Sequence, residues 1–176
     1  MRIYLIGFMG AGKSFIGKQL ANDLDLDFLD LDPWLEENEG MSIKKIFEEK
    51  GEPFFRGLEA EYLRKTISLH KIVIATGGGT PCFNKNLDWM NNHGLTVYLK
   101  ADVEVLANRL ENEPGDRPLL QNKSGPGLID RIKGLIDERE AFYGSSQICY
   151  EIVSDEQETS KELAFFLSRF LKGSIS

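Results

Sequence analysis

The stretch Gly7-Phe8-Met9-Gly10-Ala11-Gly12-Lys13-Ser14 decides the fold. A glycine, four further residues and then Gly-Lys followed by serine or threonine form the pattern of a phosphate-binding loop. The apolar run 2–6 directly before it predicts a buried strand, and Ile16, Leu20 and Leu24 after it predict a helix. Strand, loop and helix in this order are the context that the pattern requires, so we interpret the motif as a phosphate-binding loop.

The residue types of this loop suit a nucleoside triphosphate. Glycine lets backbone N–H groups turn inward around a phosphate at the positive end of a helix, where a side chain would block the anion. Lys13 supplies a positive charge to the outer phosphates, and the hydroxyl of Ser14 is a ligand for Mg²⁺. We therefore expect ATP or GTP with Mg²⁺, bound by Gly10, Ala11, Gly12, Lys13 and Ser14.

Short apolar runs alternate along the chain with longer segments of helical period, which is typical of a parallel sheet with crossover helices. We expect strands at residues 2–6, 27–30, 71–76, 95–100 and 148–153. Apolar residues recur at helical spacing from Val103 and again from Leu163. Asp102 and Asp155 stand at N-cap positions before these two helices. The pattern predicts an α/β fold.

Length and composition indicate one globular domain. The chain has 176 residues, close to the ~150 of a typical domain, so we expect a single domain over residues 1–176. Its 21 Lys and Arg and 28 Asp and Glu give a net charge of −7, which excludes nucleic-acid binding by bulk positive charge. The longest apolar runs are far shorter than the ~18 residues of a membrane span, and no signal peptide is recognisable. We expect a cytoplasmic monomer without nucleic-acid or membrane partners.

Residues 113–127 form the one long stretch without clear periodicity. They are interrupted by Pro114, Gly115, Pro118, Gly125 and Pro126. A segment of this length in a compact domain is typical of an active-site lid, and the alternative is a surface excursion without a role. We expect a lid segment around 113–127.

A nucleotide with Mg²⁺ also needs a carboxylate near the metal. The strand at 71–76 ends in three glycines and offers none, so the suppliers are Asp30 and Asp32 at the end of the strand at 27–30. Side chains alternate along an extended segment, so both carboxylates can point the same way. An equally good interpretation makes Asp32 the N-cap of a helix with Pro33 in its first turn.

Further motifs follow the phosphate loop in a fixed order. They are Phe28-Leu29-Asp30-Leu31-Asp32, Gly40, Ser42-Ile43, Ile46-Phe47, Gly51-Glu52, Phe55-Arg56, Glu59, Gly77-Gly78-Gly79, Arg117-Pro118-Leu119-Leu120, Arg139 and Tyr143. With them the chain resembles the shikimate kinase family, from its first residues to about Tyr143. The resemblance implies phosphorylation of the 3-hydroxyl of shikimate by ATP. It also implies a three-layer α/β/α fold with a five-stranded parallel sheet.

The resemblance assigns Arg56 and Arg139 to the carboxylate of shikimate, and a planar guanidinium suits a bidentate carboxylate better than an ammonium does. Glu59 lies three residues after Arg56, so on a helix it shares a face with Arg56 and can hold its guanidinium in place. Taken alone, this pair is better explained as a surface ion pair. The resemblance also implies substrate contacts from Gly77, Gly78 and Gly79.

The resemblance makes Asp32 the residue that contacts the substrate hydroxyl, as general base or as orienting group, and leaves Asp30 with Ser14 for Mg²⁺. Arg117 lies in the expected lid, and an arginine brought in by closure stabilises the charge that phosphoryl transfer spreads over the migrating group. The catalytic residues implied are thus Lys13, Asp32 and Arg117. Arg109 resembles the residue that packs on adenine in this family. The alternative interpretation is that Arg109 is a solvent-exposed charge on a helix.

Two other functions stay open from the residues alone. One is a related kinase that acts on another small polyol acid such as gluconate. The other is a nucleotide-binding regulator without catalysis. The evidence against a regulator is the presence of the residues expected for catalysis and metal binding, which are Lys13, Ser14, Asp30, Asp32 and Arg117. The expected partners are ATP and shikimate, with Mg²⁺ as cofactor.

Overall fold

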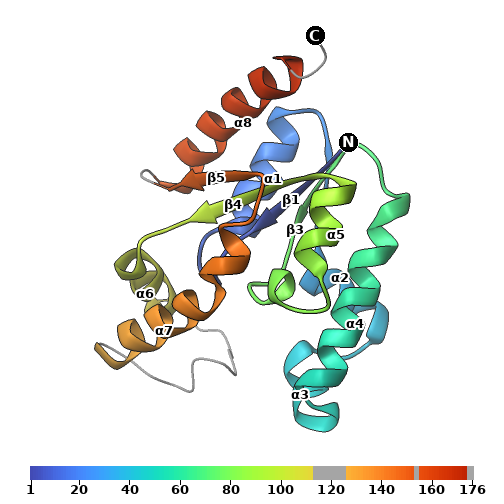
Figure 1. Ribbon diagram of the computed structural model, residues 1–176, viewed down its shortest axis with the longest axis vertical. Coiled ribbons are helices and arrows are strands. Elements are labelled where there is room, and N and C mark those ends of the chain that lie inside the picture. Colours follow the sequence, from blue (N-terminus) through green and yellow to red (C-terminus); the bar gives the residue numbers. More distant parts are fainter. Residues whose placement is uncertain (113–125, 153–154, 174–176) are drawn as a thin grey trace.

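The computed structural model describes residues 1–112, 126–152 and 155–173. Within these residues, five strands form one parallel sheet in the order β2-β3-β1-β4-β5. They are β1 (Arg2–Ile6), β2 (Asp27–Asp30), β3 (Ile72–Ala75), β4 (Leu95–Lys100) and β5 (Ile148–Glu151). Because neighbouring strands are parallel, each connection crosses a face of the sheet, as Figure 1 shows.

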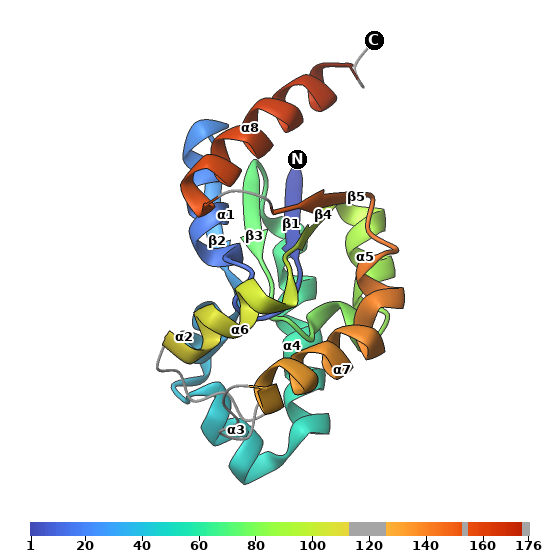
Figure 2. The same cartoon turned by 90° about the vertical axis from the view of Figure 1, so that its left-hand side faces the viewer.

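Helices form the two outer layers. They are α1 (Lys13–Asp23), α2 (Leu31–Glu39), α3 (Ile43–Lys50), α4 (Glu52–Lys65), α5 (Asn86–His93), α6 (Val103–Asn112), α7 (Pro126–Tyr143) and α8 (Glu156–Gly173). The 3₁₀ turns η1 (Thr66–Ser68) and η2 (Thr80–Cys82) follow α4 and β3. Figure 2 shows α1 and α8 together on one side of the sheet and α5 on the other.

Successive side chains of β1 point to opposite faces of the sheet and contribute to the core on both faces. Ile3 and Leu5 are fully buried in a cluster with side chains of α1 and α8. Tyr4 and Ile6 point the other way, into a cluster with side chains of α2, α4, α5 and α7. A strand buried on both faces accounts for the continuous apolar run 2–6 in the sequence. The predicted three-layer α/β/α fold with its five-stranded parallel sheet is confirmed.

All five predicted strands are present, and β1, β2 and β4 have the predicted bounds. β3 is one residue shorter at each end than predicted, and at its start Lys71 has a φ of 52° and turns the chain just before the strand. β5 ends at Glu151, and residue 153 lies outside the described residues.

The N-cap predicted for the last helix is confirmed, since Oδ1 of Asp155 accepts hydrogen bonds from the backbone N of Gln157 and Glu158 at 2.9 and 3.0 Å. The interpretation of Asp32 as an N-cap is wrong. The chain leaves the extended conformation at Asp30, which is the N-cap residue of α2, and Asp32 lies in the first helical turn.

Most of the predicted lid, residues 113–125, lies outside the described residues, and Arg117 lies within it. Residues 126 and 127 of the predicted segment are the first two residues of α7. A proline suits the first turn of a helix, where its missing N–H has no intrahelical partner to lose. These two residues of the predicted segment are therefore helical.

The carboxyl ends of β1, β2 and β3 lie at the same edge of the sheet, because all three strands are parallel and adjacent. The phosphate loop follows β1, α2 follows β2, and glycines 77–79 follow β3. Ligands of open α/β sheets bind at this edge. Among the described residues, no helix combines the length and the apolar character needed to cross a membrane.

Candidate active site

The phosphate loop turns sharply between β1 and α1. Gly7, its first residue, has a φ of 144°, and a Cβ there would lie 2.6 Å from the carbonyl oxygen of Leu99. Only glycine fits this approach of the loop to β4. Gly12 is the N-cap residue of α1, and Lys13 begins the helix. The first N–H groups of α1 thus open toward the loop, as the sequence predicts.

A cavity of about 330 Å³ lies over this loop, and we call it the donor cavity. Gly10, Gly12, Lys13, Ser14 and Asp30 line it, so the structure brings the predicted phosphate and metal residues together. Lys13 is buried, and its Nζ donates hydrogen bonds of 2.9 Å to the carbonyl oxygens of Gly7 and Phe8. The loop therefore holds the ammonium group within itself. Ala11 is buried beneath the loop and does not line the cavity.

A second cavity of about 510 Å³ adjoins the first, and we call it the acceptor cavity. Its lining includes Arg56, Glu59 and the three glycines 77–79, all predicted from the sequence. Phe47 and Phe55 also line it, with ring centroids 4.7 Å apart. The sequence did not assign these two rings to the site, because aromatic residues at helical spacing more often belong to the core.

Asp32 lies where the two cavities meet. Both cavities are lined by Met9, Asp32, Gly77 and Gly78. Burial, together with the negative charges of Glu59 and Asp30, raises the pKa of the Asp32 carboxyl to about 7, against the opposing effect of Lys13. A carboxyl group at this junction can contact an acceptor in one cavity and a phosphate in the other.

The guanidinium of Arg56 is held by two glutamates of its own helix, α4. Nε and Nη2 donate to Oε1 of Glu52 at 3.1 and 3.0 Å, and Nη1 donates to Oε2 of Glu59 at 2.9 Å. The ring centroid of Phe83 lies 4.3 Å from Cζ. A guanidinium carries five N–H donors, so two remain after these bonds for a ligand carboxylate. The interpretation of Arg56 and Glu59 as an ordinary surface pair is wrong, because their side chains are only 7% and 1% exposed.

Gly79 makes room for this guanidinium. A Cβ at Gly79 would lie 2.6 Å from Nη2, 2.8 Å from Nη1 and 2.9 Å from Cζ of Arg56. These are the atoms that would grip a carboxylate, so any side chain at position 79 displaces the functional end of Arg56. Glu52, Gly79 and Arg56 form one arrangement, of which the sequence indicated only parts.

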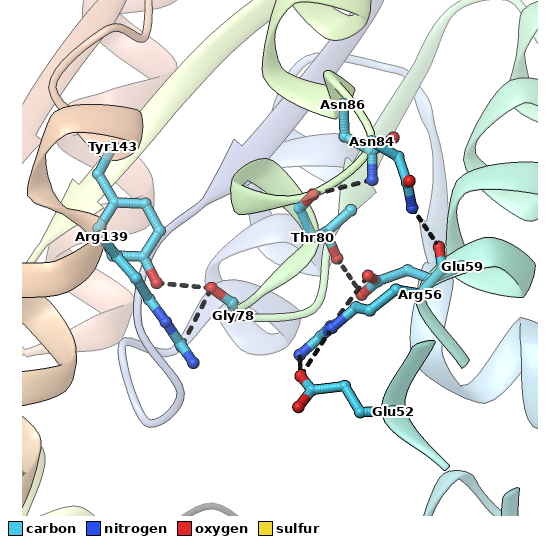
Figure 3. Close-up of polar contacts among 9 residues, drawn as sticks. All are labelled: Glu52, Arg56, Glu59, Gly78, Thr80, Asn84, Asn86, Arg139 and Tyr143. Carbon is cyan, nitrogen blue, oxygen red and sulfur yellow. Dashed lines mark hydrogen bonds and ion pairs between the residues drawn. The ribbon is translucent and has the colours of Figure 1, made fainter. Parts of the chain in front are cut away.

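Arg139 approaches from the opposite side of glycine 78. The side chain is buried, and Nη1 lies 3.5 Å from the carbonyl oxygen of Gly78. The hydroxyl of Tyr143 donates to the same oxygen at 2.5 Å, and burial raises the pKa of this tyrosine to about 12. Arg139 does not line the acceptor cavity, but Figure 3 shows the guanidinium groups of Arg139 and Arg56 on the two flanks of Gly78, both lying below it in this view. The two arginines are therefore not on opposite surfaces.

Arg109 lies against the phosphate loop instead of extending into solvent as a free helix charge. Its Nη1 donates to the carbonyl oxygen of Gly10 at 3.0 Å and lies 3.0 Å from Oε1 of Glu156. Glu156, the first residue of α8, lines the donor cavity. Glu156 was not assigned from the sequence: the resemblance implies closure over adenine by residues 154–159, but this stretch matches the family too poorly to assign residues in it. Arg117, the remaining predicted residue, lies outside the described residues.

Comparison with known proteins identifies the family of this chain. The family model described as "Shikimate kinase" matches residues 9–171. A shikimate kinase of Phocaeicola vulgatus is 40% identical over 162 residues, which cover 92% of this chain and 91% of that protein.

Two solved structures have the same fold. The shikimate kinase of Bacteroides thetaiotaomicron has a TM-score of 0.89 at 36% identity, covering 96% of this chain and 98% of the other. The shikimate kinase of Acinetobacter baumannii, solved in complex with shikimate, has a TM-score of 0.86 at 33% identity, covering 96% and 93%. Family match, identity and fold lead to one conclusion: the chain belongs to the shikimate kinase family.

Proposed function

We propose that this chain transfers the γ-phosphoryl group of ATP to the 3-hydroxyl group of shikimate, with the residues of the two cavities in the roles given below. The observation that carries the proposal is the junction of donor and acceptor cavities at Asp32. A kinase must hold two substrates with their reacting atoms in contact, and this junction is where such contact is possible.

The donor cavity fits ATP with Mg²⁺. The loop amides and Lys13 hold the phosphates. Ser14 and Asp30 supply a hydroxyl and a carboxylate oxygen to the same cavity, and Mg²⁺ binds oxygen ligands, completing its shell with water and phosphate oxygens. When bound, the ion neutralises charge on the β- and γ-phosphates. At the edge of the loop we assign to Arg109 the neutralisation of Glu156 beside the phosphates, with contact to the nucleotide base as the alternative.

The acceptor cavity fits a small ring that bears a carboxylate and hydroxyl groups. Arg56 offers its two remaining N–H donors to the carboxylate, and Arg139 completes the grip from the other side of Gly78. Phe47 and Phe55 supply the apolar wall against which the ring lies. Charge and shape therefore favour a cyclic hydroxy acid over a nucleoside monophosphate.

Asp32 accepts a hydrogen bond from the attacking hydroxyl and so orients it toward the γ-phosphate. The hydroxyl oxygen forms the new bond to phosphorus, the bond from phosphorus to the β–γ bridging oxygen breaks, and the hydroxyl proton passes to the Asp32 carboxylate. ADP and shikimate 3-phosphate leave. Since the transition state is loose, orientation by Asp32 supplies most of its effect. We assign stabilisation of the migrating phosphoryl group to Lys13 and Arg117.

A coupled assay of ADP release tests this proposal. The purified chain is given ATP with shikimate, gluconate or a nucleoside monophosphate, each with Mg²⁺ and with EDTA. We expect turnover only with shikimate and Mg²⁺. Turnover with gluconate and none with shikimate would make the chain a kinase for another polyol acid. Binding of ATP without turnover on any acceptor would make it a nucleotide-binding regulator, and size-exclusion chromatography checks the expected monomer.

A further inference from the structure

Thr80, at the start of η2, has no role in the mechanism given above. Its side chain is fully buried, and its hydroxyl donates a hydrogen bond of 2.6 Å to Oε1 of Glu59. The other oxygen of that carboxylate, Oε2, accepts from Nη1 of Arg56 at 2.9 Å. Figure 3 shows the resulting chain, in which Glu59 bridges Thr80 to the guanidinium that faces the acceptor cavity.

The Thr80 end of this chain is fixed by its backbone. The Thr80 N–H donates to the carbonyl oxygen of Gly77 at 3.1 Å, and the Thr80 carbonyl accepts from Nδ2 of the buried Asn86 at 2.9 Å. Threonine is also stiff, because its side chain is branched at Cβ. Glu59 and Arg56, in contrast, are long side chains that need contacts to stay in one conformation. The hydroxyl of Thr80 is thus the rigid point from which the other two are held.

The oxygen atoms around Gly77 show why the carboxylate of Glu59 needs a hydrogen-bond donor. A Cβ built on Gly77 would lie 2.9 Å from Oδ1 of Asp32, 3.0 Å from Oγ1 of Thr80 and 3.1 Å from Oε1 of Glu59. Two carboxylates therefore converge on one buried point, where they repel each other. Burial also raises the pKa of Glu59, and the bonds from Arg56 and Thr80 oppose this by stabilising the charged form. Without the hydroxyl, Glu59 is left to take up a proton or to turn away, and both weaken its hold on Arg56.

We propose that Thr80 is a positioning residue for the substrate carboxylate, and that its hydroxyl acts through Glu59 to keep the guanidinium of Arg56 aimed into the acceptor cavity. Thr80 does not itself touch the substrate. The inference rests on the proposed function, because it takes Arg56 as the partner of the shikimate carboxylate.

The inference predicts a specific dependence on pH. Among the residues that the structure describes, the charged or titratable groups around Glu59 are Arg56 of its own helix, Asp32 from α2, Cys82 from η2 and Arg139 from α7. These groups are the same in the wild type and in a Thr80 variant. A difference between the two proteins in how the KM for shikimate depends on pH therefore reports a change in the pKa of Glu59. Loss of the hydroxyl moves the pKa of Glu59 upward, and protonation then releases Arg56. The KM for shikimate should rise on acidification at a higher pH in the variant than in the wild type.

The experiment compares T80V, which replaces the hydroxyl with a methyl group of similar size, with T80S, which keeps the hydroxyl. KM for shikimate, KM for ATP and kcat are measured from about pH 5.5 to about pH 8.5. We expect T80V to raise the KM for shikimate about tenfold, with kcat and the KM for ATP within about twofold, and T80S to restore it. T96V is the matched control, because Thr96 is also fully buried but lies at the amino end of β4, where its hydroxyl contacts Asn91.

Three outcomes would overturn the inference: an unchanged KM for shikimate in T80V, equal impairment of T80V and T80S, or a raised KM whose pH profile stays parallel to that of the wild type. The last would mean a structural role only. If T80V does not fold, T80A and T80S give the same contrast, because both lose the methyl group and only T80A loses the hydroxyl. A wild type without shikimate-dependent turnover would instead count against the proposed function.

Discussion

The donor and acceptor cavities share a border but are built by different means. Half of the residues that line the donor cavity come from the phosphate loop and the first turn of α1, where main-chain N–H groups can bind phosphate. The acceptor cavity collects side chains from α2, α3 and α4 against the backbone of glycines 77–79. Main-chain contacts survive most substitutions, whereas a cavity assembled from charged side chains depends on each of them. Substitutions should therefore have larger and more selective effects on acceptor binding than on ATP binding.

The largest effect is expected at the border itself, from D32N. The amide keeps the size of the side chain but removes the negative charge that orients the hydroxyl, so kcat should fall about 10³-fold. The KM for ATP should stay within about twofold, because the loop amides are untouched. Steady-state kinetics with the coupled ADP assay measures both. D27N, the same change at an exposed position on β2, is the control, and a kcat of D32N within about fivefold of the wild type would remove Asp32 from the mechanism.

R56K isolates the acceptor side. Lysine keeps the charge but cannot bond to Glu52, Glu59 and a ligand carboxylate at once, so the KM for shikimate should rise about 100-fold. The KM for ATP should not change, since Arg56 does not line the donor cavity. R169K, on exposed α8 surface, controls for the chemical change. Equal losses in the two KM values would contradict the separation of the cavities.

The same contrast explains how much the sequence predicted. The donor cavity could be predicted because one contiguous motif specifies loop, helix start and ligand. The sequence left Asp32 open between two interpretations, because only the adjacency of β2, β3 and β1 shows that it lies at the junction. The role of Thr80 could not be predicted from the sequence, because it depends on a hydrogen bond to Glu59, which lies 21 residues away along the chain. Glu156 was not assigned because residues 154–159 match the family too poorly, and its contact with Arg109 beside the loop forms only in the folded chain.

G79A tests how closely the acceptor side is packed. The added Cβ would collide with three atoms of the Arg56 guanidinium, so the guanidinium must shift and the KM for shikimate should rise about tenfold. G57A is the matched control, because a Cβ there meets nothing within 4 Å. No neighbouring atom therefore requires a glycine at position 57, and G57A should leave both KM values unchanged. Because Gly57 lies inside α4, where alanine favours the helix more than glycine does, G57A should also raise the free energy of unfolding by up to ~1 kcal/mol. A G79A enzyme with the KM of the wild type would show that Arg56 has room to move.

The smallest effect is expected from R109A on the donor side, because the main chain does most of the holding there. The KM for ATP should rise only about threefold, and the KM for shikimate should not change. The structure suggests the cause: without Arg109, the carboxylate of Glu156 loses its partner beside the loop and repels the phosphates. The double variant R109A/E156Q separates this from a direct contact of Arg109 with adenine. Recovery of the wild-type KM for ATP would assign the loss to the unpaired carboxylate, which we expect. A double variant whose KM for ATP stays as high as that of R109A would mean that Arg109 contacts the base itself. ATP binding would then depend on a side chain as well as on the main chain of the loop.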